Sequence, residues 1–277
     1  MTVQLLKNTS PTVKFFVLSI LAFLSTGLLS LNHAQTTLPL TDAQKLLIGN
    51  KIWHNEGLGK IDYLSVWNEG EEFPSFGIGH FIWYPENSEE TFIEQFPQFL
   101  NYAEASGSTL PSWLKEPFIN PWQNREHFYS EFHSDKMLAL RQWLVETIPL
   151  QIDFILLRME AALPKMLVNL PAHKQKAISH LFHQITAQPS GPYALIDYIN
   201  FKGEGTSDKE RYQGQGWGLL QVLENMNPQS HNVMEAFVIS ADEVLTRRTL
   251  NAPRDEKRWL KGWRKRIQTY LHPLTLD

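Results

Sequence analysis

The sequence predicts an α+β fold that is predominantly α, with a small β-hairpin lobe and a larger helical lobe around a cleft. Three observations lead to this prediction. A well-capped helical segment begins at Thr41, a glycine-rich stretch with alternating apolar residues covers 61–84, and helical periodicity runs through most of 137–272. Hydrophobic residues make up 43% and charged residues 19%, which is an ordinary globular balance and excludes a disordered chain.

The first predicted helix runs from Thr41 to Glu56. Thr41 and Gln44 form a capping-box pattern, in which each side chain bonds the backbone N–H of the other residue. Gly57 and Gly59 supply the stop, because glycine readily adopts the left-handed conformation that ends helices. Glu56 is therefore expected on the last turn of a rigid element. A carboxylate there faces the negative end of the helix dipole, which favours a functional over a structural role.

The next two segments differ in character from this helix. Residues 61–84 combine glycine, proline and alternating apolar positions, which predicts a small hairpin or sheet. Gly77 and Gly79 allow the backbone to approach a neighbouring helix or a ligand closely. Residues 86–135 are rich in proline and aromatic residues, and we expect a short helix followed by an irregular path over the surface.

Helices are expected to account for most of the remaining chain. Residues 137–170 have a long helical periodicity that should be interrupted at Pro149 and at Pro164, because proline removes a backbone donor. Further helices are expected after Pro171, after Gly191, over 231–250 and over 255–272.

The N-terminus has the pattern of an export signal. Lys7 and Lys14 precede an apolar run at 15–31, and Ala34 is a candidate cleavage point. The run is about as long as the shortest membrane-spanning helix, so an uncleaved anchor at 15–31 is the alternative. We therefore expect residues 1–34 to be a signal peptide or N-terminal anchor and 35–277 to form a single domain. The protein is expected to be exported, periplasmic or secreted, and membrane-anchored if the signal remains.

Charge and cysteine content exclude several classes of protein. Without residues 1–34 the chain has 23 basic and 29 acidic side chains, a formal charge of −6, which does not favour nucleic acid binding. The chain has no cysteine, which excludes disulfides, thiol nucleophiles and cysteine-based zinc sites. His180 and His183 lie three apart on one predicted helix, but no third ligand has suitable spacing, so neither a metal site nor a cofactor is expected.

One spacing carries most of the functional information. Glu56-Gly57 at the predicted helix end is followed by an acidic turn that includes Glu69, and then by Ser75-Phe76-Gly77-Ile78-Gly79-His80. The pattern places a carboxyl group on a helix and aims a glycine-rich hairpin at it. This is the arrangement expected of a glycosidase that works with two carboxyl groups on opposite sides of one sugar bond.

These residues resemble the phage-type lysozymes, the muramidase and endolysin family. The resemblance implies a lysozyme-like fold, peptidoglycan as substrate, Glu56 as the catalytic acid, Glu69 as the second carboxylate and Ser75 where the family has a catalytic threonine. Here a glutamate replaces the family's aspartate and a serine its threonine. The stretches 172–185 and 258–266 are similar to the family's central and closing helices, whereas 86–169 is an extra segment without a counterpart.

Several alternatives remain at this stage. Glu71, Glu72 and Asp62 are rivals of Glu69 for the second role. If no second carboxylate is placed, Glu56 alone fits a lytic transglycosylase, in which the sugar supplies its own nucleophile. The acidic charge and the extra segment also suit a lysozyme-like protein that binds glycan or a cell-envelope partner without cleaving it.

Candidate substrate-binding residues lie in the hairpin unit and in two later glycine-rich stretches. Aromatic faces and polar groups in loops suit the apolar faces and hydroxyls of sugars. His80 is expected mainly to anchor the hairpin by hydrogen bonds. The residues named for substrate binding are His80, Trp67, Glu204, Gln215 and Trp217. The oligomeric state is left open by the sequence.

Overall fold

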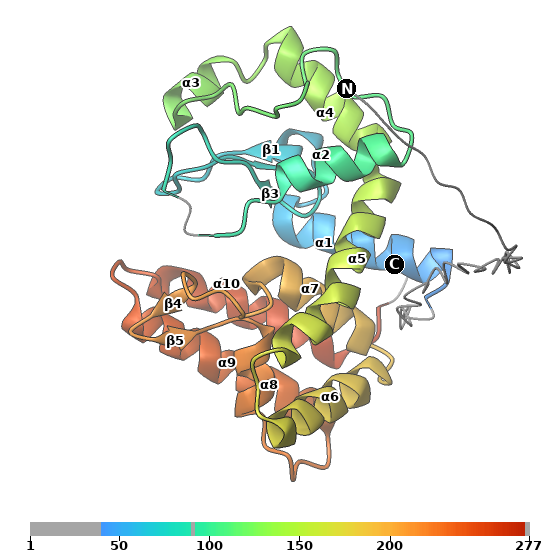
Figure 1. The fold of residues 1–277 in the computed structure, drawn as a ribbon, viewed down its shortest axis with the longest axis vertical. Coiled ribbons are helices and arrows are strands. Elements are labelled where there is room, and N and C mark those ends of the chain that lie inside the picture. The colour runs from blue at the N-terminus through green and yellow to red at the C-terminus, as the bar shows by residue number, and fades with distance from the viewer. Residues whose placement is uncertain (1–39, 90–91, 275–277) are drawn as a thin grey trace, which may run out of the picture. The chain divides into compact units, whose positions relative to one another are not determined.

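The computed structural model describes residues 40–89 and 92–274, which are predominantly helical with a small antiparallel sheet (Figure 1). This confirms the predicted α+β class, predominantly α. The predicted signal or anchor at 15–31 lies outside the described residues. Within the described ranges, no helix is long and apolar enough to cross a membrane.

Helix α1 (Asp42–Gly57) begins at the predicted capping box. The Gln44 backbone N–H donates to Thr41 Oγ1 at 3.3 Å, and the Thr41 N–H donates to Gln44 Oε1 at 2.9 Å. The helix ends at Leu58, which has a left-handed φ of 53° and donates its N–H to the carbonyl of His54. Local hydrogen bonds thus fix both ends of α1 and place Glu56 on its last turn, as predicted.

The predicted hairpin unit is a three-stranded antiparallel sheet of very short strands. A 3-10 turn, η1 (Ile61–Leu64), leads into β1 (Ser65–Val66), β2 (Ser75–Phe76) and β3 (Phe81–Ile82), in the order β1-β2-β3. Gly77 has a φ of 76°, and a side chain there would collide with Gln151 of helix α5 (Ile148–Leu167), whose Oε1 accepts the Ile78 N–H at 2.7 Å. The glycine therefore lets the hairpin dock on a helix, as its position suggested.

Three helices and a cluster of aromatic side chains surround this sheet. The helices are α2 (Phe96–Ala105), α3 (Arg125–Ser130) and α4 (Asp135–Glu146). The expectation of an irregular surface path after the short helix is partly wrong, because Trp122 is fully buried. Its ring stacks on Phe76 with 5.7 Å between centroids and meets Phe128 edge-on at 5.5 Å. The aromatic residues of this segment belong mainly to the core.

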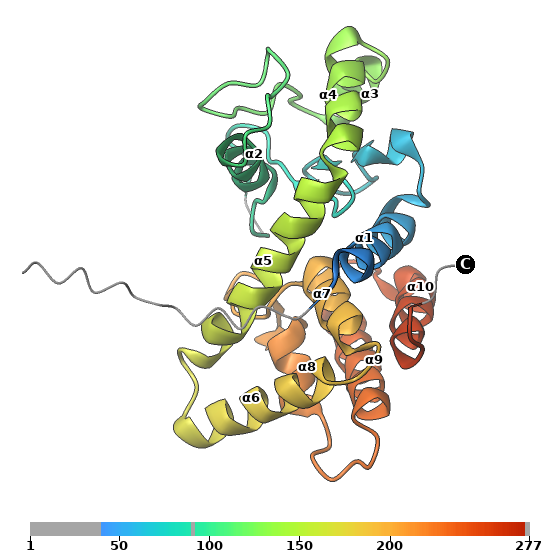
Figure 2. The same cartoon turned by 90° about the vertical axis from the view of Figure 1, so that its right-hand side faces the viewer.

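Helix α5 (Ile148–Leu167) connects the sheet region to the remaining helices (Figure 2). It packs against α1, α2 and α4 as well as against α6 (Ala172–Thr186) and α7 (Gly191–Lys202). Pro149 lies in its first turn and marks the predicted break after α4, whereas Pro164 lies inside the helix without ending it. The predicted interruption at Pro164 is therefore wrong, and the extra segment 86–169 supplies a central packing element.

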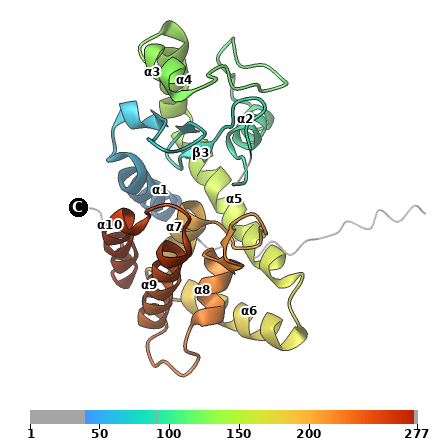
Figure 3. The same ribbon diagram turned by 90° about the vertical axis from the view of Figure 1, so that its left-hand side faces the viewer.

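The C-terminal part is helical except for one small hairpin (Figure 3). After α7 come β4 (Arg211–Tyr212) and β5 (Gln215–Gly216), then α8 (Leu219–Asn225), α9 (Val233–Asn251), α10 (Lys257–Gln268) and a final turn, η2 (Thr269–Leu271). Helix α9 packs on α8 and α10, and most of α7 is buried among its neighbours. Residues from α7 to α10 face the sheet region across a cavity, which is described below.

Candidate functional site

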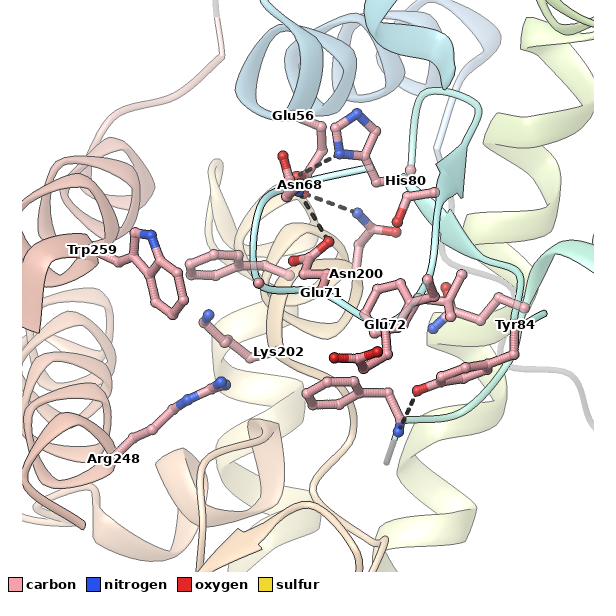
Figure 4. Close-up of a pocket in the computed structure, with 18 of the residues that line it drawn as sticks. Glu56, Asn68, Glu71, Glu72, His80, Tyr84, Asn200, Lys202, Arg248 and Trp259 are labelled. Atoms are coloured by element: carbon pink, nitrogen blue, oxygen red, sulfur yellow. Dashed lines mark hydrogen bonds and ion pairs between the residues drawn. The ribbon is translucent and has the colours of Figure 1, made fainter. Parts of the chain in front are cut away.

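A cavity of about 580 Å³ lies between the sheet region and the C-terminal helices (Figure 4). We call its two main sides the loop wall and the helical wall. The loop wall comes from the turn between β1 and β2 and from β2 itself, and consists of Asn68, Gly70, Glu71, Glu72, Phe73 and Ser75. The helical wall comes from the ends of α7 and α9, from the loop after α9 and from α10, and consists of Asn200, Phe201, Lys202, Arg248, Arg254, Trp259 and Trp263.

Glu56 lines one end of this cavity, beside His80 and Asn200 (Figure 4). Its side chain is 16% exposed. One carboxylate oxygen, Oε1, accepts from Arg266 Nη2 at 2.7 Å and from Asn200 Nδ2 at 3.4 Å, and Oε2 lies 3.7 Å from His80 Nδ1. The structure thus brings Glu56 into a cavity and partners it from three different elements, which a solvent-exposed glutamate at a helix end would not show.

Arg266 is held more tightly by Asp197 than by Glu56. Its Nε and Nη2 donate to the two oxygens of Asp197, each at 2.8 Å, and Asp197 is fully buried. Tyr270 Oη donates to the same carboxylate at 2.6 Å and Asn55 Nδ2 at 3.2 Å. Burial alone would lower the pKa of Arg266, but the two carboxylates outweigh burial and raise it. The guanidinium is therefore a fixed positive group behind Glu56.

His80 contacts both the turn that precedes the sheet and Glu56 of α1. It has a left-handed φ of 48°, and its Nε2 lies 3.0 Å from the carbonyl oxygen of Tyr63. Burial lowers the pKa of His80 and outweighs the opposite effect of Glu56. At neutral pH the ring is consequently uncharged, and its role beside Glu56 is that of a hydrogen-bonding group.

The carboxyl groups that the loop wall presents to the cavity are those of Glu71 and Glu72, not that of Glu69. Glu69 and Asp62 are exposed and lie outside the cavity lining, and Asp62 is 3.8 Å from Arg141. The first choice for the second carboxylate is therefore not supported by position. Two of its three rivals are better placed.

Glu71 is the more constrained of these two. Its Oε2 accepts from Asn68 Nδ2 at 3.1 Å, and its backbone carbonyl accepts from Trp67 Nε1 at 2.7 Å. Burial raises the pKa of Glu71, and the Glu56 carboxylate adds to the rise, while Asn68 and Arg254 oppose it. The Glu56 carboxylate thus lies within electrostatic range of Glu71. Ser75 also lines the cavity, with only 4% of its surface exposed.

Four residues predicted to bind substrate lie away from the cavity. Trp67 and Trp217 are 3% and 2% exposed and belong to the hydrophobic core. Glu204 is buried and accepts from Lys165 Nζ at 3.0 Å, whereas Gln215 is exposed on β5. Their positions do not support the predicted roles, because none of the four presents a group to the cavity.

Part of the helical wall comes from a stretch that the sequence pointed to. Asn200, Phe201 and Lys202 belong to the polar, glycine-rich stretch 200–206, which was expected to form a cleft wall. Trp259 and Trp263, one helical turn apart on α10, were not among the expected binding residues. The four-residue spacing of these tryptophans, followed by Arg266 three residues later, is the signal that places all three on one helix face. Arg254 Nη1 donates to the Gly70 carbonyl at 2.8 Å and so connects the helical wall to the loop wall.

The arrangement has the composition of an organic-ligand site rather than a metal site. Over residues 40–89 and 92–274, no three His, Asp or Glu side chains come together as they would to hold a metal ion. Aromatic rings, amides and carboxyl groups that converge on one cavity can bind a polar ligand with apolar faces and donate or accept its protons. No protein-family model, no curated protein and no solved structure matches this chain.

Proposed function

We propose that the protein is a lysozyme-like glycoside hydrolase that cleaves the glycan strands of peptidoglycan. The observation that carries the proposal is that Glu56 and Glu71 line one cavity from two separate elements, α1 and the turn between β1 and β2. Two carboxyl groups that flank one substrate are what acid–base cleavage of a glycosidic bond requires. The resemblance of the Glu56-to-His80 segment to phage-type lysozymes supports the same function.

In the proposed reaction Glu56 is the general acid. It donates its proton to the glycosidic oxygen, which leaves with one sugar, while a water oxygen adds to the anomeric carbon of the other. An acid next to Arg266 must be able to take up a proton without leaving the arginine unpaired. The two-oxygen contact between Arg266 and Asp197 meets this need, because the guanidinium keeps a buried counter-ion when Glu56 is neutral.

Glu71 is proposed as the base that removes a proton from the attacking water, in place of Glu69. Glu56, Glu71 and Ser75 all line the same cavity, in which a water could bind. Because burial raises the pKa of Glu71, it becomes an ionised base only at a higher pH than an ordinary glutamate. The aromatic rings of Trp259 and Trp263 and the amides of Asn68 and Asn200 would bind sugar faces and hydroxyls.

The raised pKa of Glu71 also favours a second candidate function. A glutamate that stays protonated is not a base, and Glu56 would then act alone as in a lytic transglycosylase. In that reaction the C6 hydroxyl of the muramic acid attacks its own anomeric carbon. The product then carries a 1,6-anhydro ring in place of a reducing end.

The proposal is tested with the purified protein, insoluble peptidoglycan and a reducing-sugar assay. The protein should release reducing ends, and Glu56→Gln should lower the rate by at least about 10²-fold, since the variant keeps the contact with Arg266 but cannot donate a proton. A Glu56→Gln variant with undiminished release contradicts the assignment. Binding of glycan by the unaltered protein with neither reducing nor anhydro products over pH 4–9 would indicate a non-catalytic binding protein instead.

The expected location fits this substrate. The N-terminal pattern predicts export to the periplasm or beyond, with 15–31 as an anchor if it is retained. Peptidoglycan or a related polysaccharide would be met there.

A further inference from the structure

Lys202, the last residue of α7, places its ammonium group in the helical wall of the cavity. Its Nζ lies 3.9 Å from the centroid of the Phe201 ring and 3.7 Å from that of Trp263. Figure 4 shows Lys202 and Arg248 on the side of the cavity opposite Glu72 and Tyr84. The two aromatic rings fix the position of the charge but leave it without a carboxylate.

The other cations of this wall already have anionic partners. Arg248 donates to both oxygens of the buried Glu256, at 2.7 and 3.2 Å. Arg254 lies 3.4 Å from the same carboxylate and also bonds the Gly70 carbonyl. Among the described residues, by contrast, Lys202 has neither a hydrogen bond nor an ion pair, and its Nζ lies over two aromatic rings. Lys202 is therefore the cation of the cavity that remains available to a ligand.

The charges around Lys202 make an added anion favourable. Burial lowers the pKa of Lys202 well below its ordinary value, and two arginines lower it further. Two carboxylates oppose this effect without contacting the ammonium group, and the loop-wall Glu71 lies within electrostatic range. An anion bound at Nζ would supply the missing counter-charge and raise this pKa again. The charged groups that face Lys202 are Arg248, Arg266, Glu256, Glu56 and Glu71.

We propose that Lys202 binds a carboxylate carried by the substrate glycan, so that the cavity selects an acidic strand over a neutral one. This inference rests on the proposed function and names the chemical feature that the enzyme reads. In peptidoglycan freed of its peptides, that group is the carboxylate of the lactyl ether on muramic acid. A point charge on a flexible stem suits a compact anion that approaches from the open side of two rings.

The test measures binding by calorimetry in the Glu56→Gln background, which prevents turnover. The two ligands are the same peptide-free peptidoglycan oligosaccharide with its lactyl carboxylates free or methyl-esterified. Lys202→Met keeps the length of the side chain and its contact with the rings but removes the charge. It should weaken binding of the acidic oligosaccharide at least about tenfold, since a charge-assisted hydrogen bond is lost. Binding of the ester should change less than about twofold, because the ester offers Lys202 no charged oxygen to bond.

Two further variants separate the charge of Lys202 from its shape and from the net charge of the protein. Lys202→Arg retains the charge and should recover most of the preference for the acidic ligand. Lys176→Met removes an exposed lysine of α6 and should change neither affinity, which controls for net charge. Thermal unfolding of each variant shows whether the protein is still folded.

Each outcome bears on the inference separately from the function. Equal losses for the acid and the ester, or no loss for either, overturn the role of Lys202 and leave glycan hydrolysis standing. If the Glu56→Gln protein with Lys202 intact binds neither oligosaccharide, both the glycan function and this inference are contradicted. If Lys202→Met is unfolded, Lys202→Gln replaces it, and an unchanged preference for the acid in that variant is an equally decisive negative.

Discussion

The loop wall and the helical wall of the cavity differ in how their charges are compensated. On the loop wall, the carboxyl group of Glu71 bonds, among the residues that the structure describes, only the neutral side chain of Asn68. On the helical side, Arg248 and Arg266 are each held by two contacts to a fully buried carboxylate, Glu256 or Asp197. One wall thus presents an acid to the cavity, whereas the arginines on the other side already have buried carboxylate partners.

The difference indicates a division of roles between chemistry and support. Groups bonded only by neutral partners can change protonation at small cost, whereas a buried ion pair loses several kcal/mol when one partner is removed. Substitutions on the loop wall should therefore reduce activity without destabilising the fold. Substitutions in the buried pairs of the helical side should reduce stability first.

The largest expected effect is that of Glu71→Gln on the rate. The variant keeps the shape and the bond from Asn68 but cannot act as a base, so kcat on peptidoglycan should fall about 10²–10⁴-fold. The melting temperature should not fall, because a neutral amide avoids the cost of burying a charge. Glu69→Gln, two residues away but exposed and outside the cavity, is the matched control and should retain its rate. A slow Glu69→Gln together with a fast Glu71→Gln would restore the original choice of second carboxylate.

The next effect concerns stability and compares two arginine–carboxylate pairs of similar length. Arg266 and Asp197 are 2.8 Å apart and buried, while Arg264 and Asp242 are 2.6 Å apart with side chains 49% and 37% exposed. Asp197→Asn should lower the free energy of unfolding by about 3–5 kcal/mol, because it leaves a buried guanidinium with only Glu56 as counter-ion. It should also slow catalysis per folded molecule, since Glu56 must then stay ionised.

Asp242→Asn is the control for this comparison and should leave the unfolding midpoint almost unchanged, because an exposed pair is screened by water. Chemical denaturation of both variants at the same pH measures the difference. Equal losses from the two substitutions would mean that burial does not set the strength of these pairs.

The smallest expected effect is a dependence of stability on pH that originates at Glu210. This glutamate is 8% exposed, and its carboxyl group accepts the backbone N–H of Ile93 from the sheet region. Burial, together with the nearby Glu204, raises the pKa of Glu210 from 4.5 to about 7. Between these two pH values the folded protein holds a proton that the unfolded chain has lost, so stability falls as the pH rises from about 4.5 to about 7.

Glu210→Gln carries no charge at any pH and should lack this loss. Its melting temperature should equal that of the unaltered protein near pH 4.5 and exceed it above pH 7. Glu69→Gln, at an exposed position, should follow the unaltered protein throughout. A constant difference between Glu210→Gln and the unaltered protein over pH 4–8 would show that Glu210 does not titrate in this range.

The sequence predicted those elements whose causes are local. The capping box of α1 involves residues three apart, and Gly77 indicates a turn with a backbone conformation that only glycine adopts easily. The same local reasoning placed Glu56 and His80 correctly beside each other. It could not supply Arg266, which lies 210 residues from Glu56 and is positioned by the packing of α10 on α9.

The errors at the site have equally physical reasons. Gly70 adopts a left-handed φ of 82°, so the direction of the side chains changes between Glu69 and Glu71 and cannot be counted from the sequence. Trp67 and Trp217 have the composition of sugar-binding residues, but whether a ring faces a cavity or the core depends on tertiary packing. Burial of Trp67 in turn uses its indole N–H to hold the Glu71 carbonyl. A residue expected to touch substrate instead fixes one that lines the cavity.

Mass spectrometry of products formed in H₂¹⁸O shows whether Glu56 and Glu71 together add water to a glycosidic bond. If they do, the muropeptides or saccharides released should carry one ¹⁸O at the new reducing end, and both Glu56→Gln and Glu71→Gln should lose these products. Products with a 1,6-anhydro end and no ¹⁸O, formed equally well by Glu71→Gln, would contradict this joint action and show that Glu56 acts alone.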